Sequence, residues 1–170
     1  SDSEDARKVA SKLDIPYYVL DYTESFSKNV VDNFTQMYAQ GLTPNPCVEC
    51  NRSVKFDHFI NQARKLNCEK VATGHYAKII KKNNEYELHK ADYLDKDQSY
   101  VLHMLKSTDL ENISFPLGEI SKPDVRQIAA RIGLKTAFKK DSQDICFVGK
   151  KDYRSFVEKR IDLTSPGEIF

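Results

Sequence analysis

The order of apolar patterns along the chain is the feature that most restricts its fold. Apolar side chains three or four positions apart predict helices over 6–13, 26–37 and 56–66. Two short apolar runs, 17–20 and 71–73, lie between these helices and predict buried strands. Because helices and strands alternate, we expect an α/β fold with a three-layer core and parallel strand pairing.

The second half of the chain predicts a hairpin and shorter elements. The segments 76–80 and 86–89 flank a polar turn at 82–85, a pattern typical of a β-hairpin. Residues 96–105 predict a short helix, and the apolar run 145–148 predicts a strand.

A helix start signal follows at Ser121. Ser121 and Asp124 can form a capping box around Pro123, and Gly133 is placed to close the helix. The residues predicted to form its buried stripe are Val125, Ile128, Ala129 and Ile132. A last helix is predicted over 153–161.

Composition limits the functional classes. The chain of 170 residues has 26 Lys and Arg against 25 Asp and Glu, so nucleic-acid binding would need local patches of charge. No apolar run approaches the roughly 20 residues that cross a bilayer, and the acidic start does not resemble a secretory signal. Four cysteines without an export signal indicate metal-binding or catalytic thiols, so we expect a cytoplasmic protein.

Cys47 and Cys50 form a C-x2-C pair one short loop ahead of the third predicted helix. A thiol near a helix start is favoured as thiolate, because unpaired N–H groups and a partial positive charge face it. The pair could act as a redox couple, as two metal ligands, or as a nucleophile with a neighbouring thiol. Alternatively, both cysteines could simply be small buried hydrophobic residues. Structural zinc is disfavoured because the chain has no second C-x2-C pair.

The other two cysteines differ in context. Cys146 lies in an apolar run next to the polar segment 141–144, so it is either a packed core thiol or the rim of a polar site. Cys68 follows a helix end without such neighbours, and we expect it to be structural.

Polar residues after the strand at 71–73 are further candidates. Gly74 follows the carboxyl end of that strand, the edge at which nucleotides and substrates bind in α/β sheets. His75 suits a ligand or base, or a capped turn residue. Lys96, Asp97 and Gln98 place a cation, a carboxylate and an amide in one turn, which suits a phosphate clamp, a reader of base edges or a solvated helix start.

Taken together, these motifs resemble the tRNA-specific 2-thiouridylases of the MnmA type. The matching stretches, in chain order, are 41–51 (GLTPNPCVECN), 55–56 (KF), 72–77 (ATGHYA), 96–100 (KDQSY), 115–118 (FPLG) and 141–147 (DSQDICF). They follow the order of the family and are spread over nearly the whole chain.

The resemblance implies a PP-loop core of the adenine-nucleotide-hydrolase type, and an enzyme that uses ATP with Mg²⁺ to replace the 2-oxygen of the wobble uridine of tRNA by sulfur. It implies that Cys146 carries the sulfur as a persulfide and that Cys50 is the nucleophile, with a disulfide between them at the end. Asn45, Pro46 and Cys47 would lie against the target base.

Further contacts follow from the same resemblance. Gly74 would contact ATP, and His75, Lys96, Asp97 and Gln98 would contact tRNA. The implied partners are a tRNA with a wobble uridine and a sulfur donor, which is a sulfur-relay protein or a cysteine desulfurase.

The resemblance also divides the chain. Residues 1–111 and 134–151 would belong to the catalytic α/β domain, and 112–133 and 152–170 to a helical tRNA-binding central domain. The phosphate-binding loop at the N-terminus of the family and its C-terminal β-barrel have no counterpart in the sequence. We therefore expect an internal fragment that is inactive alone.

Cys47 departs from the family pattern, in which Asp is frequent at this position. The third thiol allows an alternative function, an iron–sulfur-dependent tRNA-binding protein. In it, Cys47, Cys50 and Cys146 would hold a [4Fe-4S] cluster with one iron open for sulfide.

Overall fold

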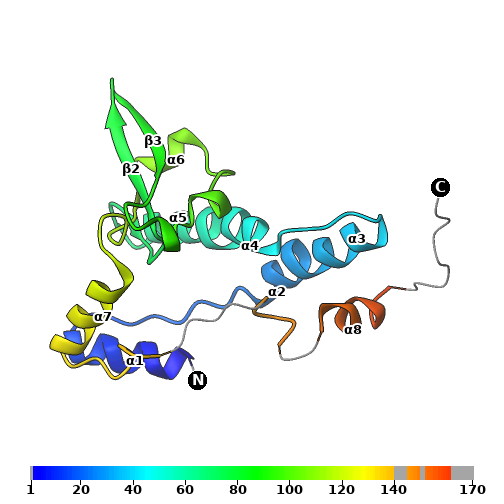
Figure 1. The fold of residues 1–170 in the computed structure, drawn as a ribbon, viewed down its shortest axis with the longest axis horizontal. Coiled ribbons are helices and arrows are strands. Elements are labelled where there is room, and N and C mark those ends of the chain that lie inside the picture. Colours follow the sequence, from blue (N-terminus) through cyan, green and yellow to red (C-terminus); the bar gives the residue numbers. More distant parts are fainter. Residues whose placement is uncertain (1, 140–144, 150–151, 162–170) are drawn as a thin grey trace.

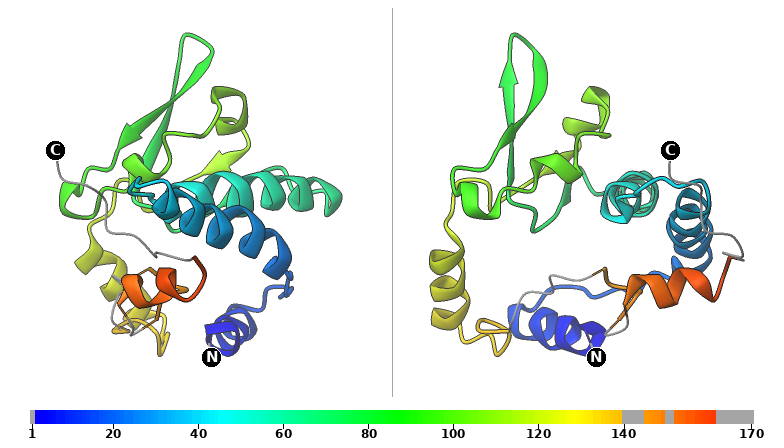
Figure 2. Two further views of the ribbon diagram at one scale, coloured as in Figure 1. Left: turned by 90° about the vertical axis from the view of Figure 1, so that its right-hand side faces the viewer. Right: turned by 45° about the vertical axis from the view of Figure 1, so that its right-hand side comes forward.

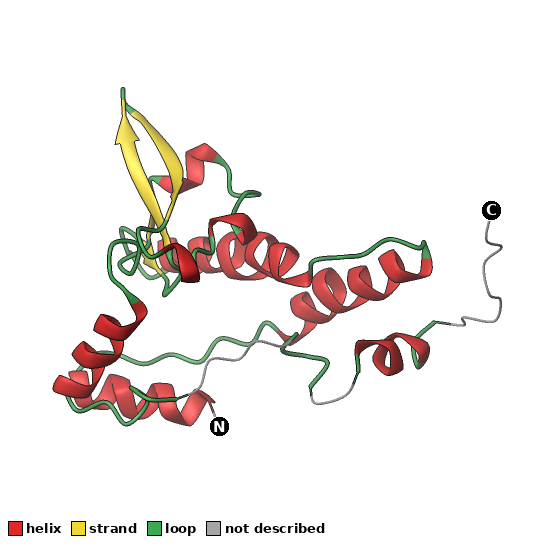
Figure 3. Cartoon of the chain, viewed as in Figure 1, coloured by secondary structure: helices red, strands yellow, loops and turns green. Residues whose placement is uncertain are grey.

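The computed structural model of the chain describes residues 2–139, 145–149 and 152–161 (Figure 1). Helices make up most of the regular structure, and the strands are few and short (Figure 3). The α-helices are α1 (Asp2–Leu13), α2 (Thr23–Phe26), α3 (Asn33–Ala39), α4 (Pro46–Glu49), α5 (Phe59–Lys65), α6 (Ser107–Leu110), α7 (Lys122–Arg131) and α8 (Tyr153–Glu158). The strands are β1 (Val71–Ala72), β2 (Ala77–Lys82), β3 (Glu85–Lys90) and β4 (Ile113–Ser114).

Two long helical segments contain a π-helical middle. The π-helix η1 (Ser27–Asp32) joins α2 to α3, and η2 (Cys50–His58) joins α4 to α5. The first segment confirms the helix predicted over 26–37. The second begins ten residues earlier than predicted, so the two cysteines of the C-x2-C pair lie inside a helix and not in a loop before it. Pro46 causes no break because it is the first helical residue, where the missing N–H would have no helical partner.

The strands form two small sheets. β1 pairs in parallel with β4, which confirms the α/β class and the parallel pairing. β2 and β3 pair antiparallel from Ala77 opposite Lys90 to Lys82 opposite Glu85, as the hairpin pattern predicts. The hairpin turns at Asn83 and Asn84, whose φ angles of 48° and 67° lie in the left-handed region that asparagine tolerates.

Two predicted strands are not formed. The run 17–20 is extended but unpaired, and its Val19 is 71% exposed. An extended segment becomes a strand only when another backbone satisfies its N–H and C=O groups, and none of the described strands pairs with this segment. The run 145–148 is a turn in which the Val148 N–H donates to the Ile145 carbonyl at 3.0 Å.

The main core lies between helix η2–α5, the small parallel sheet and the hairpin. Its buried members are Phe56, Ile60, Ala63, Val71, Ala77, Val101, Leu102, Ile113 and Phe115. Phe59 and Leu66, predicted on the same helical face, are 37% and 45% exposed. The predicted stripe was too wide, because the neighbouring elements cover only the side of the helix on which Phe56, Ile60 and Ala63 lie.

Helix α7 confirms its predicted ends but not its predicted face. The Ser121 Oγ accepts a hydrogen bond from the Asp124 N–H at 3.3 Å, and Gly133 closes the helix with a φ of 72°. Ile128 and Ile132 are nonetheless exposed, because few of the described residues pack on that side of α7. Figure 2 shows α7 beside α1 and away from the tip of the hairpin.

The segment 96–105 contains no α-helix. Two short 3₁₀ turns, η3 (Leu94–Lys96) and η4 (Ser99–Val101), replace the predicted one. The division of the chain into two domains stays a prediction. In the part of the chain that the structure describes, no helix has both the length and the apolar character that a membrane span needs.

Candidate functional site

Asn45 positions the first turn that carries the cysteine pair. Its Oδ1 accepts hydrogen bonds from the backbone N–H groups of Cys47 at 3.1 Å and Val48 at 3.4 Å, so it is the N-cap of α4. Pro46 is buried at the first helical position. Cys47 is exposed, and Cys50, one turn later, is half-buried.

An aromatic cluster brings the segment of Cys146 to the same part of the molecule. The ring of Phe147 packs edge-on against Phe34 and Phe26, with centroids 5.3 and 5.7 Å apart. Phe156 of α8 closes the cluster at 5.3 Å from Phe147. The run 145–148 is apolar because Phe147 packs against helices. The strand predicted for this run is wrong. Cys146 itself is exposed.

The surroundings of Cys50 oppose the expected thiolate. Burial is the largest influence and raises the pKa of the Cys50 thiol above its ordinary value. The positive charge of Lys55 lowers that pKa, whereas the neighbouring groups of Cys146 and Cys47 raise it further. All four cysteines are free thiols, so the expected disulfide is not present in this structure.

The three thiols do not form a metal site. Within residues 2–139, 145–149 and 152–161, no three His, Cys, Asp or Glu side chains are close enough together to hold a metal ion. Cys47, Cys50 and Cys146 therefore lack the convergent geometry that an iron–sulfur cluster needs. The structure does not favour the cluster interpretation.

The π-helical winding of η2 explains why Lys55 acts on Cys50. Residues five positions apart point about 140° away from each other on an α-helix. The i to i+5 hydrogen bonds of a π-helix bring such residues close to one face. Because η2 runs from Cys50 to His58, it places Lys55 on the face of Cys50.

Removing this charge is expected to make Cys50 less reactive. In a chain with Cys50 as its only thiol (Cys47→Ser, Cys68→Ser, Cys146→Ser), Lys55→Gln is expected to slow alkylation by iodoacetamide at neutral pH about two- to fivefold. Lys55→Arg retains the charge and should retain the rate. Equal rates with and without the Lys55→Gln substitution across the pH range would show that the charge does not act on this thiol.

Gly74 and His75 follow β1 and take different positions. Gly74 is exposed, and the nearest atom that an added Cβ would meet is Leu117 Cδ1 at 3.7 Å, so the backbone there is open to approach. The His75 side chain is only 8% exposed. Its ring lies 6.0 Å from that of Phe56 and 5.9 Å from that of Phe115, and its Nδ1 is 2.8 Å from the Thr73 hydroxyl.

This environment keeps His75 neutral. Burial, with a smaller effect from the charge of Lys55, lowers the pKa of His75 from 6.5 to about 4. The imidazole is therefore uncharged near neutral pH and packs as part of the core. The contact with tRNA expected for His75 stays a prediction, and in this structure its side chain offers little surface.

Stability is expected to fall when the pH drops from 6.5 towards 4. Between these values the unfolded chain binds a proton at His75 that the folded chain, with a pKa of about 4, does not bind. The free energy of unfolding should therefore decrease by at most about 3 kcal/mol over this window. Urea denaturation at several pH values measures the slope. His75→Asn should flatten it, and an unchanged slope in that variant would show that His75 is not the titrating group.

Asp97 and Gln98 are occupied by internal hydrogen bonds. The Asp97 carboxylate accepts from the Ala91 N–H at 2.8 Å and from the Ser99 hydroxyl at 2.7 Å. The Gln98 Oε1 accepts from the Tyr76 N–H at 3.1 Å, and the Gln98 N–H donates to the Tyr76 carbonyl at 2.8 Å. Lys96, next to them, is half-buried. The motif at 96–100 is thus fastened to the motif at 72–77.

Sequence reasoning assigned no role to Asn51, although it lies next to Cys50. Asn51 is only 2% exposed, and its Nδ2 donates to the Val101 carbonyl at 3.2 Å. This bond holds the cysteine-bearing helix against η4. The sequence contains a signal for this role. Asn51 stands on the side of the helix that faces the core, and a buried amide needs a hydrogen-bond partner.

Gly118, in the matching motif 115–118, is needed for close packing. A Cβ added to Gly118 would overlap the carbonyl oxygen of Ala77, so only glycine lets the segment 115–118 approach β2. The Gly118 carbonyl accepts a hydrogen bond from the Asp92 N–H at 2.9 Å. This motif supports the scaffold and lies apart from the thiols in sequence.

Comparison with known proteins places the chain in a family. The family described as "tRNA methyl transferase HUP domain" matches residues 1–150. A protein named tRNA-specific 2-thiouridylase MnmA from Leptospira interrogans is 46% identical over 166 residues, which are 98% of this chain and 44% of that protein. The protein of that name from Rickettsia peacockii is 49% identical over 169 residues, 99% of this chain and 46% of that protein.

A third relative of the same name, from Chloroflexus aurantiacus, is 49% identical over 153 residues, 89% of this chain and 43% of that protein. The chain thus spans less than half the length of these relatives. The resemblance to the MnmA type, expected from the motifs, is confirmed over nearly the whole chain. Since 150 of its 170 residues match one family, the chain belongs to the family of the tRNA methyl transferase HUP domain.

Proposed function

We propose that this chain forms the thiol-bearing part of a sulfurtransferase that makes 2-thiouridine at the wobble position of tRNA, with ATP. One observation supports this most: Phe147, next to Cys146, packs on Phe34 at 5.3 Å, and Phe34 lines the same cavity as Asn45, the N-cap of the helix that carries the half-buried Cys50. The names of the relatives, which are 46–49% identical, agree with this activity. Two thiols that can approach each other are the chemical requirement for passing on sulfur from a persulfide.

In the proposed reaction Cys146 carries the sulfur and Cys50 releases it. A donor protein, a sulfur-relay protein or a cysteine desulfurase, leaves Cys146 as a persulfide. The Cys50 thiolate attacks the Cys146 Sγ and breaks the sulfur–sulfur bond, so that hydrosulfide leaves with the bonding electron pair. Cys50 and Cys146 are then joined in a disulfide, and an external thiol reductant supplies two electrons to reopen it. The exposed position of Cys146 suits loading by a partner protein.

The hydrosulfide attacks C2 of the uridine and displaces its oxygen. ATP supplies the adenylate that makes this oxygen a leaving group. The open backbone at Gly74, at the carboxyl end of β1, fits the approach of a nucleotide. Joining Cys50 and Cys146 brings their Cα atoms within about 7 Å.

A cavity beside the N-cap of α4 suits the target base. It has a volume of about 260 Å³, and its lining includes Asn45, Pro46, Phe34, Met37 and His103. A base must leave its stack before chemistry at its edge, and apolar and aromatic walls with a few polar groups would hold it. Asn45, Pro46 and Cys47 would then contact the base. Lys96 would contact the tRNA, with Asp97 and Gln98 holding the loop next to His75.

The proposal is tested in a chimera. This chain replaces the aligned region of the Leptospira interrogans relative, and the chimera is produced in bacteria that lack their own thiouridylase. Mass spectrometry of tRNA nucleosides then measures 2-thiouridine. We expect thiolated tRNA in the strain with the chimera. A stable chimera that binds tRNA and ATP but makes no 2-thiouridine, beside an active parent relative, would contradict the proposal.

A further inference from the structure

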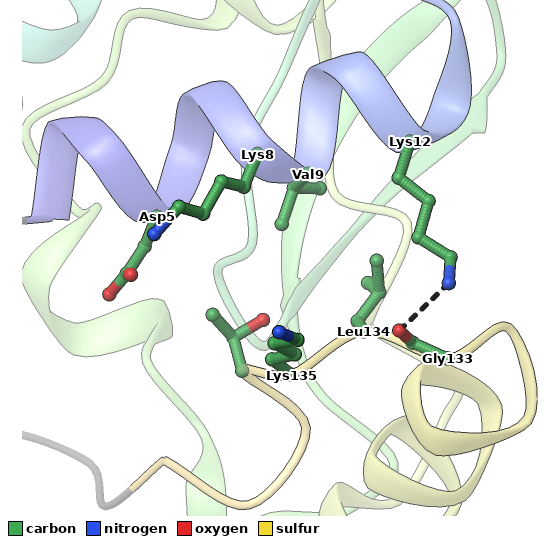
Figure 4. Close-up of a pocket in the computed structure, with 8 residues that line it drawn as sticks. Asp5, Lys8, Val9, Lys12, Gly133, Leu134 and Lys135 are labelled. Carbon is green, nitrogen blue, oxygen red and sulfur yellow. Dashed lines mark hydrogen bonds between the residues drawn. The ribbon is translucent and has the colours of Figure 1, made fainter.

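A cavity between α1 and the segment after α7 lies apart from the thiols. It has a volume of about 270 Å³ and joins residues 5–12 to residues 133–136, which are distant in sequence. Figure 4 shows Lys8, Val9 and Lys12 facing it from α1, and Leu134 and Lys135 facing it from the segment after α7. Val9 and Leu134 give it apolar walls, while the three lysines bring positive charge.

The cavity has an excess of positive charge, because three lysines and one carboxylate, that of Asp5, line it. Lys12 donates its hydrogen bond to the Gly133 carbonyl at 3.0 Å, which leaves its full charge (Figure 4). Asp5, which also lines the cavity, is bound by Lys139 at 2.9 Å. Within the described residues, Lys135 has no carboxylate partner.

Lys8 adds to this excess. Its Nζ is 3.9 Å from the Glu4 carboxylate, which Arg7 already binds with two hydrogen bonds of 2.7 and 2.9 Å. The whole chain has a formal net charge of only +1, so the excess of positive charge here is local. A concave site with three ammonium groups favours a ligand of high negative charge, such as a phosphate group.

An exposed aromatic ring continues this surface. Phe138 is 74% exposed, and it lies in the turn between Lys135 and Lys139. Lys139, which is ion-paired with Asp2 and Asp5, lines a second cavity of about 270 Å³ together with Lys122 and Arg126 of α7. Cations that alternate with an exposed ring are typical of surfaces that bind the backbone and the bases of single-stranded nucleic acid.

We infer that the cavity between α1 and the segment after α7 binds a backbone phosphate of RNA, and that Phe138 stacks on an unpaired base next to it. The identity of the RNA as tRNA rests on the proposed function. The assignment of a phosphate to the cavity rests on the positions of the lysines that line it. Its role is to hold RNA at a distance from the thiols, so it needs neither ATP nor the cysteines.

The salt dependence of RNA binding tests the phosphate site. The probe is an unmodified tRNA transcript with a fluorescent label, titrated with the 170-residue chain at several salt concentrations. Each lost lysine–phosphate contact lowers the slope of log K against log salt concentration by about 1. Lys12→Gln with Lys135→Gln removes two of the three lysines around this one phosphate, so it should lower the slope by about 1 and weaken binding about tenfold at physiological salt.

Two controls exclude other causes. Lys82→Gln with Lys90→Gln removes the same charge from the exposed surface of the hairpin and should leave the slope nearly unchanged. Because Lys12 also binds the Gly133 carbonyl, the single Lys135→Gln variant repeats the test without disturbing that bond and should lower the slope in the same direction by less than about 1. Equal slopes for the cavity variants and the hairpin variant would overturn the phosphate assignment.

The stacking contact is tested separately. Phe138→Ala should weaken binding about fivefold or more without a change in the salt slope, and unchanged affinity would remove Phe138 from the site. Competition by inorganic phosphate alone at low concentration would indicate a free-phosphate site, and competition by poly-glutamate equal to that by RNA would indicate an acidic protein; both overturn the inference. Loss of thiolation in the chimera with retained salt slopes would contradict the proposed function and leave this site standing.

Discussion

Replacing Cys50 by serine in the chimera is expected to lower 2-thiouridine in tRNA by at least about a hundredfold. The hydroxyl of serine fits the half-buried site but cannot attack a persulfide at neutral pH, because it is a far weaker nucleophile than a thiolate. Mass spectrometry of tRNA nucleosides measures the product, and binding of labelled tRNA shows that the variant still recognises its substrate.

Cys146→Ser is expected to give an equal loss for a different reason, since no sulfur can be loaded. The two losses are separable with radioactive sulfur from a donor: the Cys50→Ser chain should keep the label on Cys146, whereas the Cys146→Ser chain should take up none. Cys68→Ser is the matched control, because Cys68 is an exposed thiol far from the aromatic cluster in sequence. Full thiolation by either Cys50→Ser or Cys146→Ser would refute the proposed roles.

The second large effect is expected on stability. Phe56→Ala should lower the free energy of unfolding by about 3–5 kcal/mol. Phe56 is 2% exposed, and its ring lies 6.2 Å from that of Phe115 and 6.0 Å from that of His75. Truncation leaves a cavity between the helix η2–α5 and the strands, and the surrounding backbone can close it only in part.

Phe59→Ala is the matched control, because the same residue type stands one helical turn away on a face that is 37% exposed. Its loss should be below about 1.5 kcal/mol. Urea denaturation followed by circular dichroism measures both variants. Equal losses for Phe56→Ala and Phe59→Ala would show that the helix packs on a different face from the one described.

Local signals in the sequence predicted local features well. The N-cap at Ser121, the closing glycine Gly133 and the Asn83–Asn84 turn are confirmed, because each depends on side chains and backbone angles within a few residues. The runs 17–20 and 145–148 were wrongly predicted as strands. A strand needs a partner from elsewhere in the chain, so apolar character alone cannot distinguish a strand from a turn that packs against helices.

The same distinction holds for the candidate site. The motifs identified the cysteines, Gly74 and the 96–98 turn, but they did not show that Gln98 binds the Tyr76 backbone or that Asn51 binds the Val101 carbonyl. They also predicted thiolate at Cys50 from its place near a helix start. Burial by distant parts of the chain outweighs that local effect and raises the pKa of the thiol instead.

Residue chemistry and short-range geometry were thus readable along the chain: which groups can attack, cap, turn or carry charge. Tertiary structure alone decided which of them meet. Packing of Phe147 on Phe34 brings the segment of Cys146 towards Cys50, and the contact of Lys12 with Gly133 closes a cationic cavity between distant segments. The physical reason is that burial, electrostatic reach and cavity walls depend on distances in space, which the spacing of residues in a sequence does not contain.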